Sequence, residues 1–90
     1  MEKLNEEQLE AFKEVIDNLN ENDLELVEAY VLDKHATDKL DAINVFVFRN
    51  FNSLMTEHNL IDRLSCFEDE EFAHFKVTTI EDVFIIYAYI

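Results

Sequence analysis

The sequence contains no glycine and no proline among its 90 residues. Turns that need a positive φ angle normally place Gly there, so asparagine, the next most tolerant residue, is expected at such positions. Phosphate-binding loops of the Walker and Rossmann kinds are excluded because both require glycines at fixed positions. An EF-hand is excluded as well. Its best frame starts at Asp17 but has Leu19 at the third position and Asn22 where Gly is required.

Cysteine and long hydrophobic runs are also scarce. The single cysteine, Cys66, excludes an internal disulfide and a cysteine-based zinc site. The longest apolar runs, Val45–Phe48 and Val83–Ile90, are far shorter than the ~20 residues that a membrane-spanning helix needs. The first residues are acidic and lack the basic-then-apolar order of a signal peptide. We therefore expect a soluble, cytoplasmic protein.

Basic residues are few. The chain has 7 Lys and Arg against 21 Asp and Glu, which gives a formal net charge of −14. Direct binding of nucleic acid is not expected, because phosphates are bound by clustered Lys and Arg. Hydrophobic residues make up 49% of the chain, too many for a disordered acidic tail. At this length we expect one compact domain, residues 1–90, without a linker or second domain.

The first segment predicts a helix over Asn5–Leu19. Asn5 suits the N-cap and Gln8 follows three residues later, in a variant of the capping box. Apolar residues then recur at helical spacing and form one stripe. Another face carries acidic residues spaced three and four apart, which repel one another by roughly a few tenths of a kcal/mol per pair. The stripe is Leu9, Phe12, Ile16 and Leu19, and the acidic column is Glu7, Glu10, Glu14, Asp17 and Glu21.

A second helix is expected over Asp23–His35, with Asn22 as its N-cap. Asparagines in the segment Asn18–Asp23 end the first helix, because their side-chain amides compete for backbone hydrogen bonds. The two helices together predict an acidic αα-hairpin at the N-terminal end of the chain. A second acidic column on this hairpin consists of Glu21, Glu25 and Glu28.

The middle of the chain, residues 40–57, fits two structures. Apolar residues keep a helical period from Leu40 to Leu54, which favours a largely buried helix. The run Ile43–Phe48 is instead rich in strand-forming residues, so a strand is the alternative. A further short helix is expected over Leu60–Phe67. It ends at an acidic cluster, Glu68, Asp69, Glu70 and Glu71.

The last segment predicts a β-hairpin. Residues from Ala73 to Thr79 alternate between apolar and polar, as in a half-buried strand. Ile80–Asp82 forms the turn, and Val83–Ile90 has no polar position. That last strand must be covered on both faces or meet a second copy of the chain. The expected fold class is therefore α+β and mainly helical, with an N-terminal acidic αα-hairpin, a central buried helix or strand, and a C-terminal β-hairpin.

No catalytic residue, metal site or cofactor is expected. The three histidines lie far apart without ligand spacing, and Glu71 and His74 form a single Glu-x-x-His where a di-iron bundle needs two copies and two further Glu. Cys66 fits a small buried apolar side chain better than a nucleophile. We therefore expect the protein not to be an enzyme.

The acidic columns have two interpretations. They can be a solvated face that keeps the protein soluble, although −14 exceeds the ~2–8 charges that solubility usually requires. They can instead complement a basic surface of another protein and steer its association. Acids at these spacings fall ~5.3 Å apart along a helix, against one phosphate per ~3.4 Å of a DNA strand. Two columns or a dimer would be needed to approach the charge density of a duplex.

In size and charge the chain resembles the small acidic inhibitors that phages and mobile elements make against restriction, CRISPR or transcription enzymes. It is also similar to acidic immunity proteins and antitoxins. No family motif is present, so no functional residue is carried over. The leading hypothesis is a non-enzymatic inhibitor that covers the basic, nucleic-acid-binding surface of another protein, as a DNA mimic does. The expected partner-binding residues are Glu7, Glu10, Glu14, Asp17, Glu21, Glu25, Glu28, Glu68, Asp69, Glu70 and Glu71.

Two alternatives remain at this point. The first is an immunity protein or antitoxin that neutralises a basic toxin or nuclease, in which a few aromatic residues dominate the binding energy and charge sets the on-rate. Tyr30, Tyr87 and Tyr89 are its candidate contacts. The second is a dimeric scaffold with a solubilising acidic face, held together through the apolar segment Val83–Ile90.

Overall fold

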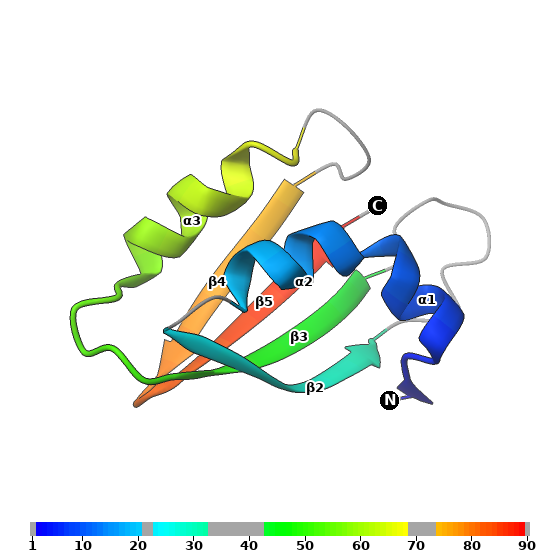
Figure 1. Ribbon diagram of the computed structural model, residues 1–90, viewed down its shortest axis with the longest axis horizontal. Helices are drawn as coiled ribbons and strands as arrows, with labels where there is room; N and C mark the ends of the chain where they lie inside the picture. Colours follow the sequence, from blue (N-terminus) through cyan, green and yellow to red (C-terminus); the bar gives the residue numbers. More distant parts are fainter. Residues whose placement is uncertain (1, 21–22, 33–42, 69–73, 90) are drawn as a thin grey trace.

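In the part of the chain that the structure describes, five strands form an antiparallel sheet with a layer of helices on one face (Figure 1). The computed structural model describes residues 2–20, 23–32, 43–68 and 74–89. Across the sheet the strands follow the order β1-β2-β3-β5-β4. The elements are β1 (Glu2–Lys3), α1 (Glu6–Ala11), α2 (Lys13–Leu19), β2 (Leu24–Val31), β3 (Ile43–Asn50), α3 (Glu57–Ser65), β4 (His74–Ile80) and β5 (Val83–Tyr89).

Strands β3 and β5 form the centre of the sheet. Their register places Phe46 opposite Ile86 and Phe48 opposite Phe84. Successive side chains of a strand point to opposite faces, so these four residues share one face. All four are at most 2% exposed, and they lie beneath the helices in a single cluster of buried residues.

The helices cover this face from two sides. The predicted capping box at the start of α1 is confirmed: Gln8 N–H donates to Asn5 Oδ1, and Asn5 N–H donates to Gln8 Oε1. Phe12, between α1 and α2, packs edge-on against Phe46 with ring centroids 5.0 Å apart. At the other side of the sheet α3 lies over β4, and its residues Leu60 and Leu64 are fully buried.

The prediction of a mainly helical chain is wrong. Of the residues that the structure describes, 45% lie in strands and 31% in helices. The helix expected over Asp23–His35 is absent from its described part, because Leu24–Val31 forms strand β2. The N-terminal αα-hairpin is therefore also wrong, and α1–α2 is followed by a strand. Residues 33–35 lie outside the described residues.

Residues Leu24–Val31 form a strand and not a helix because they pair with a segment that is distant in the sequence, Ile43–Asn50. β2 runs antiparallel to β3 in a register that aligns Leu24 with Asn50 and Val31 with Asn44. A register shift between Leu26 and Glu28 inserts Val27 as an extra residue, as in a β-bulge. Because of this shift, apolar residues fall toward the helices on both sides of the bulge. The spacing of Leu24, Val27 and Val31 that predicted a helix therefore combines residues in different surroundings, because Leu24 is buried whereas Val27, at the bulge, is 45% exposed.

In the middle of the chain the strand alternative is right and the buried helix is wrong. Ile43–Asn50 is β3, and residues 40–42 lie outside the described part. The helix expected over Leu60–Phe67 is present but begins and ends earlier, at Glu57 and Ser65. Thr56 caps it, because its hydroxyl oxygen accepts a hydrogen bond from the Asn59 N–H at 3.3 Å.

The predicted C-terminal β-hairpin is confirmed, with β4 and β5 paired from His74–Tyr89 to Ile80–Val83. The turn between them is Glu81–Asp82. Within the described residues the positive φ angle falls on Glu81, at 55°, and not on an asparagine as expected. A first central residue with positive φ is where tight hairpin turns normally place Gly.

Replacing Glu81 by Gly should therefore stabilise the protein. The left-handed backbone conformation of Glu81 destabilises the folded state by roughly 1–2 kcal/mol, and Gly would remove this cost. The greater conformational entropy that Gly gives the unfolded chain would offset roughly 0.4–1 kcal/mol of that gain. We expect a gain of about 0.5–1 kcal/mol in the free energy of unfolding, measured by urea titration. The matched control is Asp82→Gly, which should destabilise because Asp82 does not have a positive φ angle. Equal effects of the two variants would contradict this explanation.

Candidate functional site

The acidic face of α1–α2 consists of Glu7, Glu10, Glu14 and Asp17, and all four side chains are exposed. Within the described part of the chain none of them makes an ion pair. The column is not straight, because Phe12 leaves helical geometry with φ −106° and ψ 6°. Figure 1 shows the axes of α1 and α2 at an angle to each other. The predicted acidic column is thus divided into two short parts.

A shallow hollow lies between this face and strand β2. Leu9, Ile16 and Leu26 supply its apolar lining, and the charged residues around it are Glu10, Lys13 and Asp17. Its volume is about 250 Å³. A neighbouring hollow of about 190 Å³ shares Leu9 and Leu26 and continues along β2 to Glu28 and Lys3. No pattern in the sequence indicates this feature, because both hollows form only where a helix and a strand meet in the folded chain.

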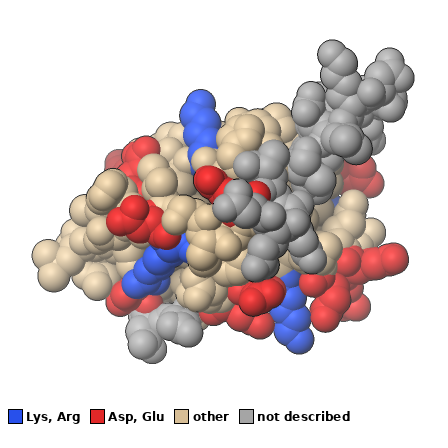
Figure 2. Space-filling model, turned by 90° about the horizontal axis from the view of Figure 1, so that it is seen from above, with Lys and Arg blue, Asp and Glu red and all other residues tan. Residues whose placement is uncertain are grey.

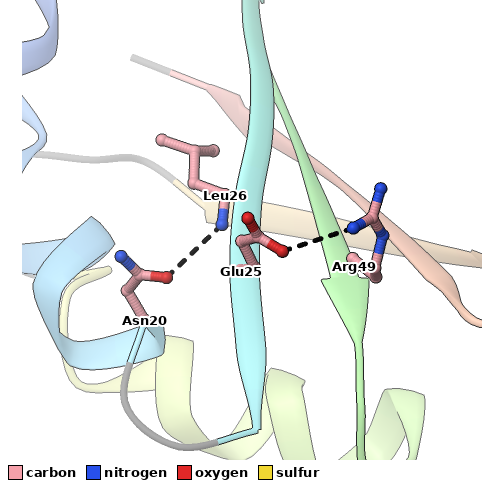
Figure 3. Close-up of polar contacts among 4 residues, drawn as sticks. All are labelled: Asn20, Glu25, Leu26 and Arg49. Atoms are coloured by element: carbon pink, nitrogen blue, oxygen red, sulfur yellow. Dashed lines mark hydrogen bonds and ion pairs between the residues drawn. The ribbon is translucent and has the colours of Figure 1, made fainter.

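The second predicted column lies on β2 and not on a helix. Glu25 is opposite Arg49 in the register of β2 and β3, and its Oε2 lies 3.4 Å from Arg49 Nη1 (Figure 3). Both side chains are about half exposed, so this pair contributes little to stability. It also neutralises one of the acids that the sequence analysis assigned to a partner.

Glu28 interacts with a tyrosine two residues away. Its carboxylate accepts a hydrogen bond from the Tyr30 hydroxyl and raises the pKa of Tyr30, with smaller contributions from desolvation and from the carboxylate charge. Glu28 is exposed and Tyr30 is half-buried. By strand alternation both lie on the face of β2 away from the helices. Glu28 therefore points away from the helices, although it also lines the smaller hollow beside Leu9 and Leu26.

The remaining predicted acids do not extend the acidic face of α1–α2. Glu68 is half-buried just beyond α3, which lies near β4 at the opposite edge of the sheet from β2. Glu21, Asp69, Glu70 and Glu71 lie outside the described residues. Figure 2 shows Asp and Glu side chains at several separate places, with Lys and Arg among them. The structure thus unites Glu10 and Asp17 at one hollow but separates the other described acids.

The other candidate groups show no catalytic arrangement in the described residues. Cys66 is exposed and not buried as expected, and its thiol donates to the Arg63 carbonyl oxygen at 3.1 Å. His58 Nε2 lies 3.6 Å from Asp62 Oδ2 on the solvent-exposed side of α3. No group of three or more metal-ligating side chains occurs in the described ranges. Among those ranges no helix has the length and apolar character needed to cross a membrane.

No protein-family model matches the chain, and no curated protein or solved structure matches it either. The candidate function therefore rests on the geometry and charge of the described residues.

Replacing Glu28 by Gln should lower the pKa of Tyr30 toward its ordinary value, because the amide is a weaker acceptor and carries no charge. The ring-carbon chemical shift of Tyr30, followed by NMR against pH, measures this. In the native protein the hydrogen bond stabilises the fold fully below a pH of about 10, and that stability is lost as pH rises through the raised pKa. The control Glu25→Gln should leave the Tyr30 titration unchanged. A shift in both variants would contradict the assignment to Glu28.

Proposed function

We propose that the protein is a non-enzymatic, cytoplasmic inhibitor that binds the basic, nucleic-acid-binding surface of another protein through its α1–α2 face. The observation that carries this proposal is the hollow beside Leu9, Ile16 and Leu26, next to the exposed carboxylates of Glu10 and Asp17. Such a surface suits a partner segment that presents an apolar side chain flanked by Lys or Arg. The apolar contact would supply affinity and the carboxylates would supply steering.

The charge of the whole chain supports the same partner class. A net charge of −14 attracts a basic surface from a distance and repels nucleic acid. On the acidic face of α1–α2 the attraction is not cancelled, since within the described residues the four acids of this face make no ion pair. Enzymes that act on nucleic acids present basic surfaces of this kind. Occupation of such a surface would block access of the nucleic acid.

The geometry narrows how the inhibitor would act. The predicted mimicry of a duplex required two columns of acids or a dimer, and within one chain the second column lies on a strand with Glu25 paired to Arg49. The α1–α2 face is better suited to binding one basic groove of a partner than to mimicking a long DNA duplex. The proposed contact therefore involves a limited set of carboxylates around the hollow.

Reversing Glu10, Glu14 and Asp17 to Lys should weaken partner binding without unfolding the chain, because all three side chains are exposed. The tagged protein is incubated with lysate of its natural host at ~50 and ~500 mM salt, where screening lengths differ about threefold. Each retained nucleic-acid enzyme is then purified and its inhibition titrated. At the lower salt we expect the triple variant to inhibit ~10–100-fold less well, from roughly 0.5–1 kcal/mol for each reversed contact.

A matched variant controls for the change in net charge. Glu57, Asp62 and Glu81 are exposed and lie away from α1–α2, so their reversal to Lys alters the net charge equally. This control should retain inhibition to within about threefold. If both triple variants lose inhibition to the same extent, overall charge and not the α1–α2 face is responsible. If neither loses it, the acidic face is a solvated surface.

The immunity-protein alternative has one observation in its favour. Its three candidate tyrosines share one face of the sheet, since Tyr30 and Tyr87 both align with Val45 and Tyr89 follows on the same side of β5. The Tyr89 ring stacks on His74 with centroids 4.2 Å apart. A partner that stays bound at ~500 mM salt and is lost on Tyr89→Ala, but not on the α1–α2 reversal, would favour this alternative.

A further inference from the structure

The face of the sheet away from the helices is apolar and has no covering layer within the described residues. Val45 shows the apolar character of this face: it is 5% exposed and does not belong to the cluster beneath the helices. It is buried instead on the other face of β3, between its cross-strand neighbours Tyr30 and Tyr87. We call this the open face. On the four long strands it carries Glu25, Glu28, Tyr30, Ile43, Val45, Val47, Arg49, His74, Lys76, Thr78, Ile80, Val83, Ile85, Tyr87 and Tyr89.

An antiparallel sheet with one solvated face normally alternates apolar and polar residues. Strand β5 lacks this alternation, because the residues that point away from the helices are also apolar or aromatic. They are Val83, Ile85, Tyr87 and Tyr89, and all four are half-buried. Beside them on β3 lie Val45 and Val47. A contiguous apolar patch of this kind on a small protein marks an interaction surface.

The charge of the open face differs from that of the rest of the chain. On the four long strands it carries two acids, Glu25 and Glu28, and two bases, Arg49 and Lys76. These charges balance, whereas the chain as a whole has a net charge of −14. A second copy approaching this face meets no net local repulsion, unlike a copy approaching the exposed acids of α1–α2. A basic partner has no charge advantage here.

We propose that the open face is the interface of a homodimer, in which two copies pack sheet to sheet about a two-fold axis parallel to the strands. Such an axis keeps the strands of both sheets nearly aligned, as in packed β-sheets. It also exchanges the two sides of the sheet, so that β4 of each copy faces β2 of the other and β3 faces β5. Val45 and Val47 then meet Tyr87 and Ile85 of the second copy.

The same operation makes the charges complementary. Lys76 lies in the cross-strand row of Tyr30, and Glu28 lies in the next row, beside Val47. The two rows are two residues apart, about 6.6 Å along the strands, a distance that an extended lysine side chain spans. Each Lys76 therefore reaches Glu28 of the other copy, and the two-fold axis produces this ion pair twice.

The size of the open face predicts a weak dimer. Four strands about 4.8 Å apart and seven residues long at about 3.3 Å per residue cover roughly 19 × 23 Å. The two copies together would bury on the order of 900–1,200 Å², at the lower end for specific complexes. We expect a dissociation constant on the order of micromolar. This proposal is independent of the proposed function, since the two use opposite faces of the protein.

Sedimentation velocity of the full chain over a ~1–300 µM range tests the proposal, with the expected shift from monomer to dimer in the micromolar range. Lys76→Glu should weaken the dimer by about tenfold or more, because at each of the two contacts it places a second acid beside Glu28. Glu28→Lys should weaken it similarly. The double variant, Lys76→Glu with Glu28→Lys, exchanges the charges and should restore dimerisation to within about threefold of the native chain.

Lys13→Glu is the matched control, because it makes the same change of charge on exposed α2. It should leave the dimer within about twofold of the native chain. All variants are checked for folding by circular dichroism, and Ile85→Thr, a strand-compatible change on the open face, should also weaken the dimer. A native chain that remains monomeric throughout the range overturns the proposal. A dimer that Ile85→Thr leaves intact, or that the charge exchange fails to restore, also overturns it.

Discussion

The pairing of β3 with β5 is the interaction on which the rest of the structure depends. Both strands are apolar at odd and at even positions, so their pairing creates two apolar faces at once. The helices α2 and α3 cover one face, and Phe46, Phe48, Phe84 and Ile86 become its centre. The other face receives no helix from the described chain. The division of the molecule into a helical side and an open face follows from this one pair of strands.

Features that depend on neighbouring residues could be predicted from the sequence. The capping box of Asn5 and Gln8 needs only a spacing of three residues, and the hairpin of β4 and β5 joins adjacent segments through a tight turn. The residue with the positive φ angle was harder to predict from the sequence, because the register of the two strands places Glu81 at that position. A sequence without glycine still needs that backbone geometry, and a residue that suits it less well supplies it.

Features that depend on distant residues could not be predicted. Leu24–Val31 has the apolar spacing of a helix, and only its pairing with Ile43–Asn50 and the shift beside Val27 make it a strand. The predicted grouping of the acidic residues on two helices was wrong for the same reason. Glu25 and Glu28 were grouped with the helical acids, but a strand carries them to Arg49 and Tyr30. The hollow beside Leu26 requires α1–α2 and β2 to be in place first.

The contact between Asn20 and Leu26 has a consequence for how copies of this chain can associate. In the described residues β1 pairs with Tyr30 and Val31 of β2, and the Leu4 N–H donates to the Ala29 carbonyl oxygen. The first part of β2 therefore lies at an edge where another strand could add by backbone hydrogen bonds. Asn20 Oδ1 accepts the Leu26 N–H at 3.4 Å (Figure 3), and the register shift beside it interrupts the regular pairing of the strand. Edge addition repeats without limit and leads to fibrils, whereas pairing of two faces ends with the second molecule. The Asn20 side chain thus helps to protect an aggregation-prone, strand-rich chain from fibril formation by edge addition.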